Sequence, residues 1–598
     1  MKNFRNFSIS IFLILIFLGI SKLQFAQKTL SYQRIINGLD QPDFDEGATD
    51  FVFDDINMDG NLDILSVGDH GSPNFNTAQH GILVWFGDGQ GNFQNYMNGN
   101  FGYGGIAAGD VNNDGFKDVG FGVHHNYSST NFGDQLIEVA LGDGTGMNWQ
   151  PYDAGLATNG ETWGMFGTAF ADFDNNGLLD LVSISFGCCA GLHVYLNQGD
   201  GSWQQSFGFT GGGSGFLVRT CDINNDGFMD FISSHQNGTA YFGDGTGNFE
   251  NNDTGLPGAG STARAGLDVA RINTTESTGF SYINSSGGVK VFAWDNLLEK
   301  WTDLSGNLPA TGIYQLSQIS DMNNDGFIDV MAYGNLHFQL WDGDDAGNWI
   351  ADAAFTTNDD PGDGNAMRTD GDLDKNGFPD LLILTTELTG SWIQVNKNIV
   401  YAYLENSPAD ELWIKPLFPN GNEHFYPGTA QFIEWATEVP AGTNSTVKIE
   451  LSAFGPDGPW WLLADNLPNN GKHQWIVPET GSENIFLKFT ISDGFIEETA
   501  ITAAPFTIFG SPTSISRSKF QGNNNLLYPN PGNDWIEISD SRNIKRFCLF
   551  SLDGQCLIDL QNPSFPINTK NLNGGLYHFK IWFNDGSDGA GKWVKILN

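Results

Sequence analysis

The sequence predicts an all-β protein: a seven-bladed β-propeller, then an immunoglobulin-like or fibronectin-like β-sandwich, then a small C-terminal β-sandwich. Three observations support this prediction. Glycine is abundant, with 76 of 598 residues, and it follows no collagen period. Short apolar runs alternate with turn residues, whereas long segments with a helical period are rare. A segment of about 50 residues recurs along the first two thirds of the chain.

The charge balance is strongly acidic. The chain has 70 acidic and 27 basic residues and a formal net charge of −43 at pH 7. Such a surface repels phosphate backbones and anionic lipid, so we expect no nucleic-acid partner. Hydrophobic residues at 40% and aromatic residues at 13% suffice for packed cores, which excludes an acidic disordered chain. The five cysteines are too few and too irregularly spaced for a disulfide framework or a zinc site.

The N-terminus has the pattern of a secretory signal peptide. Lys2 and Arg5 precede the apolar run Ile9–Ile20, and Ala26 supplies a small residue for cleavage. We therefore expect residues 1–26 to be removed and the mature protein to be exported. The alternative is an uncleaved anchor, but the run is short for a membrane span. No transmembrane span is expected after the signal is removed.

A nine-residue motif, D-x-[ND]-x-[DN]-G-x-x-D, occurs six times. Its copies start at residues 55, 110, 172, 222, 321 and 372, and the intervals are 55, 62, 50, 99 and 51 residues. The interval of 99 is about twice the others, and a seventh copy lies inside it at Asn273–Ser281, where the acidic ligands of the motif are missing. The chain therefore has seven repeats, six of which carry the acidic motif.

Each acidic motif offers three aspartates and one asparagine around a glycine, a set of oxygen ligands that suits a hard cation. Three carboxylates at this spacing repel one another unless a divalent ion lies between them. We therefore predict calcium sites, up to six Ca²⁺ ions in all. The predicted ligands are Asp55, Asn57, Asp59 and Asp63; Asp110, Asn112, Asp114 and Asp118; Asp172, Asp174, Asn176 and Asp180; Asp222, Asn224, Asp226 and Asp230; Asp321, Asn323, Asp325 and Asp329; and Asp372, Asp374, Asn376 and Asp380.

An EF-hand is the rival interpretation of these motifs. That loop requires a glutamate at its twelfth position, where this chain has Ser66, Phe121, Ser183, Ser233, Ala332 and Ile383. The flanking runs are also short and rich in β-formers, unlike the helices of an EF-hand. The motifs are therefore expected to be turns between strands.

A glycine turn followed by an aromatic residue comes later in most repeats. Clear copies are Trp85–Phe93, Leu141–Trp149 and Tyr241–Phe249, and looser ones are Tyr195–Trp203 and Gln339–Trp349. Such turns provide the positive φ of a tight hairpin. Each repeat then has four antiparallel strands, and seven such repeats indicate seven propeller blades.

These motifs resemble those of the FG-GAP/VCBS repeat proteins, whose blades are similar to those of integrin α-subunit propellers. The resemblance covers about Leu30–Glu405 of the predicted propeller, residues 28–408, and implies calcium in the motif loops. It implies little about activity, because a fold hosts many functions.

Residues 411–510 lack metal motifs and alternate apolar and polar positions, as in Thr446–Leu451, which predicts the second domain. The adjacent Trp460 and Trp461 suggest either a sugar-stacking platform or one core ring beside one ring at the rim. Residues 511–525 are rich in Ser, Gly and Asn and are expected to be a linker.

Residues 526–598 contain Leu526–Gly532 with its Tyr-Pro-Asn-Pro sequence, a Gly-Leu-Tyr strand and a final strand rich in lysine. This order resembles the C-terminal sorting domain of the type IX secretion system of Bacteroidetes. The resemblance implies export across the outer membrane, followed by release or surface attachment, with the secretion machinery as a partner. The alternative is a plain β-domain. Cys548 and Cys556 lie unequally about the turn at Asp553, so we assign no disulfide.

The sequence contains no G-x-S-x-G, H-E-x-x-H or P-loop motif. We therefore expect a secreted or cell-surface protein that binds or adheres to a glycan or a protein. The alternative is an extracellular polysaccharide lyase or hydrolase, or an accessory subunit of one. A catalytic or transition-metal cluster of histidines, among them His70, His124, His125 and His235, is a further possibility beside their interpretation as polar loop residues.

In a four-stranded blade, alternate turns lie on opposite faces, so the metal loops and the glycine turns share one face. The opposite face is predicted to bind the partner, because its loops are long and varied. Its candidate ligand-binding aromatics are Tyr103, Tyr127, Trp163 and Phe166, with the pair Cys188 and Cys189 nearby. The alternative is that these loops only pack on one another.

Overall fold

The computed structural model describes residues 29–39, 50–67, 81–99, 101–102, 104–123, 125–126, 134–161, 165–185, 191–211, 217–258, 265–272, 277–357, 364–387, 397–510, 527–528, 535–538, 544–551, 556–573, 575–584 and 588–595. Within these ranges the regular elements are all β-strands, which confirms the predicted all-β class. The signal-peptide residues 1–26 lie outside them. No helix in the described ranges is long and apolar enough to cross a bilayer.

Seven four-stranded antiparallel sheets occupy the described part of residues 32–405, and we number them as blades in chain order. Blade 1 has β2 (Val52–Asp54), β3 (Asp63–Val67), β4 (Ile82–Gly87) and β5 (Phe93–Asn98). Blade 2 has β7 (Ile106–Gly109), β8 (Asp118–Gly122), β10 (Ile137–Gly142) and β11 (Trp149–Pro151). Blade 3 has β12 (Met165–Ala171), β13 (Asp180–Ser185), β14 (Leu192–Asn197) and β15 (Trp203–Phe209). Blade 4 has β16 (Val218–Cys221), β17 (Asp230–Ser233), β18 (Ala240–Gly243) and β19 (Phe249–Asn251).

The later blades follow the same plan. Blade 5 has β20 (Ala265–Ile272), β21 (Ser277–Ile283), β22 (Val289–Asp295) and β23 (Lys300–Asp303), at the position of the repeat without acidic residues. Blade 6 has β24 (Leu316–Ser320), β25 (Asp329–Gly334), β26 (His337–Asp342) and β27 (Ile350–Thr356). Blade 7 has β28 (Gly364–Gly371), β29 (Asp380–Glu387), β30 (Lys397–Glu405) and, as its outer strand, β1 (Tyr32–Ile35). A short extra pair joins β6 (Phe101–Gly102) to β9 (His125–Asn126).

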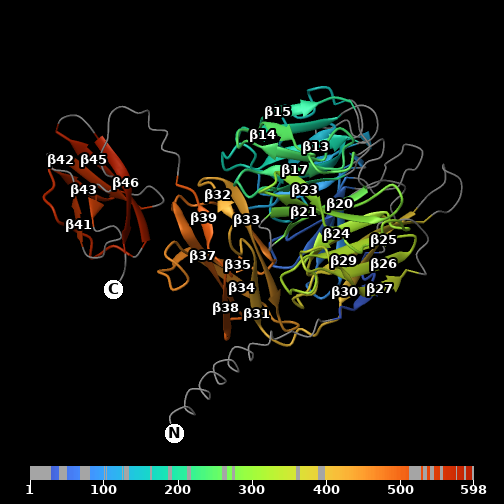
Figure 1. The fold of residues 1–598 in the computed structure, drawn as a ribbon. Coiled ribbons are helices and arrows are strands. Elements are labelled where there is room, and N and C mark those ends of the chain that lie inside the picture. The colour runs from blue at the N-terminus through green and yellow to red at the C-terminus, as the bar shows by residue number, and fades with distance from the viewer. Residues whose placement is uncertain are drawn as a thin grey trace, which may run out of the picture.

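The blades form a closed ring (Figure 1). The first strand of each blade contacts the first strand of the next, from β2 through β7, β12, β16, β20 and β24 to β28, and β28 contacts β2. The N-terminal strand also closes the ring through hydrogen bonds, because β1 pairs antiparallel with β30, with Tyr32 opposite Glu405. The N-terminal strand therefore completes the last blade, and a propeller fold results.

Apolar clusters between neighbouring blades hold the ring together. One cluster combines Leu65 and Val84 of blade 1 with Val119 and Ala140 of blade 2. Comparable clusters join blades 3 and 4, blades 5 and 6, and blades 6 and 7. The aromatic residue after the glycine turn is buried in most blades, as in Trp203 and Trp349, which are 4% and 3% exposed. Its burial packs the turn against the blade.

The second domain is a β-sandwich. One sheet has β31 (Trp413–Phe418), β33 (Ala430–Glu438) and β36 (Lys472–Ile476). The other has β32 (His424–Phe425), β39 (Phe506–Ile508), β37 (Ser482–Ser492), β34 (Thr446–Ser452) and β35 (Trp461–Pro468), with β38 (Glu497–Ile501) paired to β37. The two sheets enclose an apolar core that includes Trp435, Ile449 and Phe489. Trp461 packs against this core, whereas Lys488 Nζ lies 4.8 Å from the centre of the Trp460 ring.

The C-terminal domain has two small sheets with a shared core that includes Trp593. The strands are β40 (Leu527–Tyr528), β41 (Trp535–Ile538) and β44 (Ile567–Asn568) in one sheet, and β43 (Cys556–Gln561), β42 (Ile544–Phe550), β45 (Gly575–Phe583) and β46 (Asp588–Lys595) in the other. In the β42–β43 pair, Cys548 is opposite Asp559 and Cys556 is opposite Phe550. The two cysteines are not cross-strand partners, as the sequence predicted.

Candidate metal loops and the face they form

The six acidic motifs fold into equivalent loops between the first and second strands of their blades, and we name each loop after its blade. The residue at position 4 of every loop has a φ close to +60°, as in Asn225. The glycine at position 6 has a φ of +86° to +93°, as in Gly227. Positions 4 and 6 therefore both have a left-handed backbone conformation, and these two residues fold the first half of the loop back on itself.

The side chain at position 1 organises each loop. In loop 4, Asp222 Oδ1 accepts a hydrogen bond from the Asp226 amide at 3.1 Å, and Asp222 Oδ2 accepts one from the Gly227 amide at 2.8 Å. The same two hydrogen bonds occur in loops 1, 2, 3, 6 and 7. The motif spacing therefore fixes where the first carboxylate points.

The aspartate at position 9 closes each loop from within the blade. Asp230 Oδ2 accepts a hydrogen bond from the Ile223 amide, and Asp230 Oδ1 accepts one from the Gly243 amide at the end of the third strand. The other five loops have the same pair of contacts. All six closing aspartates are 0% exposed.

Burial makes these carboxylates costly to ionise. Burial and the neighbouring aspartates raise the pKa of Asp63 and of Asp118 to about 8. The same causes raise the pKa of Asp180, Asp230, Asp329 and Asp380 well above the usual range of a carboxyl group. A cation among the carboxylates would replace the lost solvent and offset their repulsion.

Positions 1, 3 and 9 converge. In loops 3 and 7, where position 3 is an aspartate, one oxygen of each of the three carboxylates lies within 4.8 Å of the other two. These groups are Asp172, Asp174 and Asp180, and Asp372, Asp374 and Asp380. In the other four loops the residue at position 3 is an asparagine, and its Oδ1 accepts the amide of position 5 as the aspartate does. Loops 3 and 7 thus present carboxylate oxygens from three positions of the motif, a donor set that fits Ca²⁺.

The side chain at position 5 contacts the backbone of the second half of its loop. Asp226 Oδ1 accepts a hydrogen bond from the Phe228 amide at 2.9 Å, and the corresponding residue does the same in the other five loops. One oxygen of each position 5 side chain is therefore directed toward the second half of its own loop.

The β-sandwich covers the face that carries these loops (Figure 1). It contacts the first aspartate of three loops directly. These contacts are Asn470 Nδ2 to Asp55 Oδ2 at 3.1 Å, the Ala430 amide to Asp172 Oδ2 at 2.8 Å, and Lys415 Nζ to Asp321 Oδ2 at 3.5 Å. Three metal loops are therefore linked to the sandwich through a predicted ligand.

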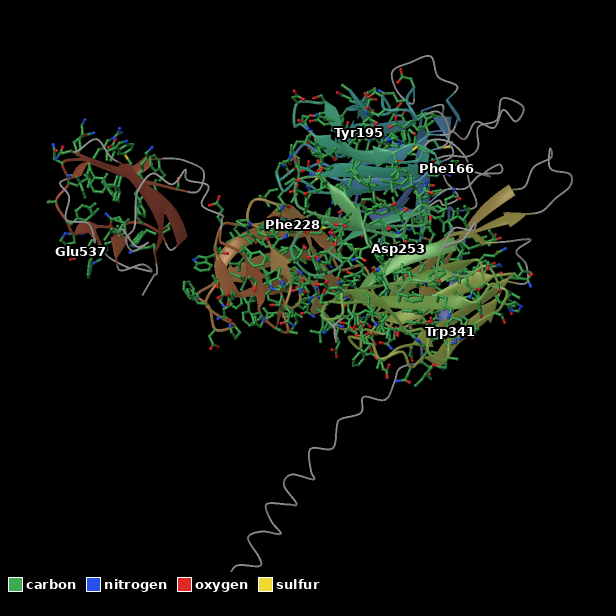
Figure 2. All side chains as sticks on the ribbon, turned by 45° about the horizontal axis from the view of Figure 1, so that its top comes forward. Phe166, Tyr195, Phe228, Asp253, Trp341 and Glu537 are labelled. Atoms are coloured by element: carbon green, nitrogen blue, oxygen red, sulfur yellow. The ribbon has the colours of Figure 1, made fainter. Side chains whose placement is uncertain are left out.

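The sandwich contacts the remaining loops through other groups. Gln474 exchanges two hydrogen bonds with the backbone of Asp110 in loop 2, at 3.0 and 2.7 Å. The Val439 amide donates to the Lys375 carbonyl of loop 7 at 3.0 Å. Phe228 of loop 4 stacks on Tyr426 with the ring centres 4.6 Å apart, and Figure 2 shows Phe228 beside the sandwich.

The sequence prediction did not include this docking. The end of the last propeller strand nevertheless indicates it. The strand β30 ends at Glu405, and the Glu405 amide donates a hydrogen bond to Asp380 Oδ1 of loop 7. The chain therefore leaves the propeller at the metal loops, and only residues 406–412 separate β30 from β31. So short a connector places the next domain on the same face.

The predicted ligand-binding aromatics have different outcomes. Phe166 is 2% exposed, so the expectation that it is an exposed contact residue is wrong. The strand β12 already begins at Met165, so Phe166 is part of the blade and not of the preceding loop. In Figure 2, Phe166 lies on the side of the propeller away from the sandwich. Tyr103, Tyr127 and Trp163 lie outside the described residues.

The other groups singled out on that face are also only partly described. His70, His124, Cys188 and Cys189 lie outside the described residues, as does the side chain of His125. His235 is 1% exposed and packs edge-on against Phe209, with the ring centres 5.4 Å apart. His235 is therefore a core residue of its blade.

Blade 3 contains a buried polar group that the sequence prediction did not single out. Glu161 accepts a hydrogen bond from the Tyr195 hydroxyl and lies 3.2 Å from His193 Nδ1. Glu161 is 9% exposed and His193 is 0% exposed. Because both side chains are buried, this group is positioned to stabilise the blade and not to meet a substrate.

A polar cleft of about 950 Å³ lies beside loop 4, between blades 4 and 5 and the sandwich. Its lining includes Asn224, Glu250, Trp294, Glu299 and His424. This cleft is a second surface where a ligand could bind, and it was not predicted because its residues come from separate blades and from the sandwich.

Two segments match family models. Residues 172–233, which include loops 3 and 4, match the FG-GAP-like repeat, and residues 526–595 match the secretion system C-terminal sorting domain. No curated protein matches the chain.

Several solved structures resemble the chain weakly. Sqt1 of Saccharomyces cerevisiae is 12% identical, with a TM-score of 0.35 over 67% of this chain and 97% of that one. The SapL1 lectin in complex with alpha methyl fucoside is 13% identical, with a TM-score of 0.32 over 54% and 99%. AofleA from Arthrobotrys oligospora is 9% identical, with a TM-score of 0.31 over 64% and 88%. Similarities this low carry no functional argument.

Proposed function

Because the chain carries an FG-GAP-like repeat and ends in the sorting domain of the type IX secretion system, it is exported across the outer membrane, and we propose that it there binds a glycan or a protein as a calcium-stabilised β-propeller. The proposed organisation is a signal peptide at 1–26, the propeller at 28–408, the sandwich at 411–510, a linker at 511–525 and the sorting domain at 526–598.

Calcium is the metal that best suits the six loops. Their donors are carboxylate and amide oxygens, which a hard divalent ion prefers, and none is a sulfur or an imidazole. The closing aspartates are fully buried, and burial opposes their ionisation unless a cation compensates. We propose up to six Ca²⁺ ions, one for each acidic loop.

The observation that carries the proposed binding role is the position of the sandwich. It contacts the metal loops of blades 1, 2, 3, 4, 6 and 7, so these loops are committed to contacts within the chain. The partner is then expected on the opposite face, which carries the connections between second and third strands and between blades. Tyr103, Tyr127 and Trp163 belong to those connections in the sequence and remain the proposed contact residues.

An enzyme is the second candidate: a polysaccharide lyase or hydrolase, or an accessory subunit of one. The polar cleft beside loop 4 favours it most, because Glu250 and Glu299 place two carboxylates in a recess with Trp294. The same cleft would equally serve as a binding subsite.

The test uses the purified mature protein on glycan and protein arrays, with calcium and with a chelator, beside an activity assay on a polysaccharide panel. We expect specific binding that is lost with the chelator, and no cleavage. Trp163→Ala and Tyr127→Ala should weaken binding at least tenfold while calcium content and Tm stay unchanged, because these side chains are expected to contact the partner and not the metal.

The comparison variant is Glu250→Ala in the cleft. If Glu250→Ala abolishes binding and the two aromatic variants do not, the partner lies in the cleft and the assignment of the face is wrong. Cleavage of a polysaccharide that Glu250→Ala abolishes would establish the enzyme alternative instead.

A further inference from the structure

Three carboxylates outside the repeat loops meet at one edge of blade 2. Asp134 precedes β10, Glu138 lies in β10, and Asp153 follows β11. One carboxylate oxygen of each lies within 4.8 Å of the other two. Asp134 ends the connection between the second and third strands, and Asp153 begins the connection to blade 3. The group therefore lies on the face opposite the metal loops.

Two of the three side chains are buried. Glu138 is 0% exposed and Asp153 is 6% exposed, whereas Asp134 is exposed to solvent. Glu138 Oε1 accepts a hydrogen bond from the Gln135 amide at 2.8 Å. Asp153 Oδ2 is buried and accepts no hydrogen bond from the described residues. A buried carboxylate oxygen without a donor beside two further carboxylates is unfavourable unless a cation is bound.

Blade 4 has an aspartate, Asp253, at the place that Asp153 occupies in blade 2, but the described residues form no group of three carboxylates there. In the strand registers, Ala140 is opposite Pro151 and Tyr241 is opposite Asn251, so Asp253 corresponds to Asp153. The backbone turn is also the same, because the Leu156 amide donates to the Asp153 carbonyl as the Leu256 amide donates to that of Asp253. The two aspartates therefore occupy equivalent places in their blades.

The surroundings of the two aspartates differ. The Asp253 carboxylate accepts hydrogen bonds from the amides of Thr239 and Ala240, at 3.1 and 2.9 Å, and from Asn251 Nδ2 at 3.2 Å. Figure 2 labels Asp253 within the propeller. The residue that corresponds to Thr239 in blade 2 is Glu138. Blade 2 thus places a carboxylate where blade 4 has a hydroxyl residue, and it brings Asp134 to the same point.

We propose that Asp134, Glu138 and Asp153 bind a divalent cation of the calcium type, at a site separate from the repeat loops. Carboxylate oxygens alone form the donor set, which suits a hard ion. Exposed Asp134 provides the entry side, and the buried pair supplies the fixed donors. The bound ion would tie the connection before β10 to the connection after β11. This proposal does not depend on whether the repeat loops bind calcium.

The test counts bound calcium in the mature protein by metal analysis after equilibrium dialysis. Asp153→Asn keeps the side-chain volume and removes the charge, and it should lower the count by one ion per chain. Glu138→Gln should do the same, and it serves as the independent variant if Asp153→Asn does not fold. The matched control is Asp253→Asn, which alters the equivalent position in blade 4 and should leave the count unchanged.

A second measurement separates a metal site from a structural role. With a chelator present, Asp153→Asn should have a Tm at or above that of the wild type, because one of three mutually repelling charges is gone. With saturating calcium, the variant should have the lower Tm. An unchanged ion count in both blade 2 variants, or an equal Tm change with and without calcium, overturns the proposal.

The ion count also distinguishes the blade 2 site from the repeat loops. If Asp153→Asn lowers the count and Asp226→Ala does not, the blade 2 site stands and loop 4 binds no ion. If only Asp226→Ala lowers the count, loop 4 binds an ion and the blade 2 site does not.

Discussion

At the scale of single residues, the acidic loops repeat one geometry six times. The first aspartate accepts two backbone amides, and the ninth accepts an amide from its own loop and one from the end of the third strand. These contacts lie within a few residues or between adjacent strands, so the motif spacing was sufficient to predict them. The same reasoning was wrong for Phe166. It was expected in a surface loop, but β12 already begins at Met165 and Phe166 is buried.

The first prediction concerns one ligand of loop 4. Asp226→Ala should lower the calcium count by one ion per chain, because it removes a predicted donor and leaves the other five loops intact. Metal analysis after dialysis measures this. A wild-type count of two ions or fewer would contradict the assignment of the loops.

At the scale of elements, the second prediction concerns the glycine at position 6, which lies against the sandwich in loop 4 but not in loop 6. Gly227 has a φ of +88°, and a Cβ there would lie 3.1 Å from the His424 carbonyl oxygen and from the Tyr426 ring. Gly326 has a φ of +93° in loop 6, but a Cβ there would meet nothing within 4 Å. Gly326→Ala should cost about 1–2 kcal/mol from the left-handed φ alone.

Gly227→Ala should cost more than Gly326→Ala, because it also displaces the sandwich. Denaturant unfolding at saturating calcium measures both variants in the same way. Equal losses of stability would mean that the sandwich does not press on loop 4 in solution.

A third prediction tests the closure of the ring by β1. The Tyr32 ring packs against Phe338 and Phe355, with ring centres 6.1 and 6.5 Å apart, and its buried hydroxyl has no hydrogen-bond partner among the described residues. Tyr32→Ala should therefore destabilise the protein by roughly 2–4 kcal/mol. Tyr32→Phe removes only the hydroxyl and should leave stability unchanged or slightly higher. A loss with Tyr32→Phe as large as that with Tyr32→Ala would show that the hydroxyl, and not the packing, holds β1.

At the scale of the whole molecule, the proposed metal binding and the docking of the sandwich involve the same aspartates. The sandwich contacts the first aspartate in loops 1, 3 and 6, so the ions that we propose would hold the groups on which the sandwich rests. A ligand that binds only the folded state stabilises it by mass action, by about 2.7 kcal/mol per site at 100 times its Kd.

The fourth prediction follows from this linkage. A chelator should lower the Tm of the propeller well beyond the change that an equal ionic strength of sodium chloride causes, and it should loosen the sandwich at the same time. Calorimetry with and without chelator measures the first effect, and hydrogen exchange at Lys472–Ile476 measures the second. A Tm that is unchanged by the chelator contradicts structural calcium.

The fifth prediction concerns export. Deletion of residues 526–598 removes the sorting domain and should leave folded propeller in the periplasm of a host that has type IX secretion. Among the described residues, the apolar clusters of the propeller include none from that segment, so folding should not suffer. Cell fractionation measures the location, and normal surface delivery of the truncated protein would contradict the assigned role.

Features that depend on neighbouring residues could be predicted from the sequence: the all-β class, the repeat, the glycine turns, the fold of the acidic loops and the sorting domain. Their signals are local, because turns and hairpins need only a few residues in the correct order. The structure, and not the sequence pattern, shows which distant segments meet. It pairs β1 with β30 and places the sandwich on the acidic loops. Within blade 2, it also shows that Asp134, Glu138 and Asp153 meet around the adjacent strands β10 and β11. Ring closure and docking of the sandwich depend on contacts between residues that are far apart in the sequence. A short-range sequence period therefore cannot predict them.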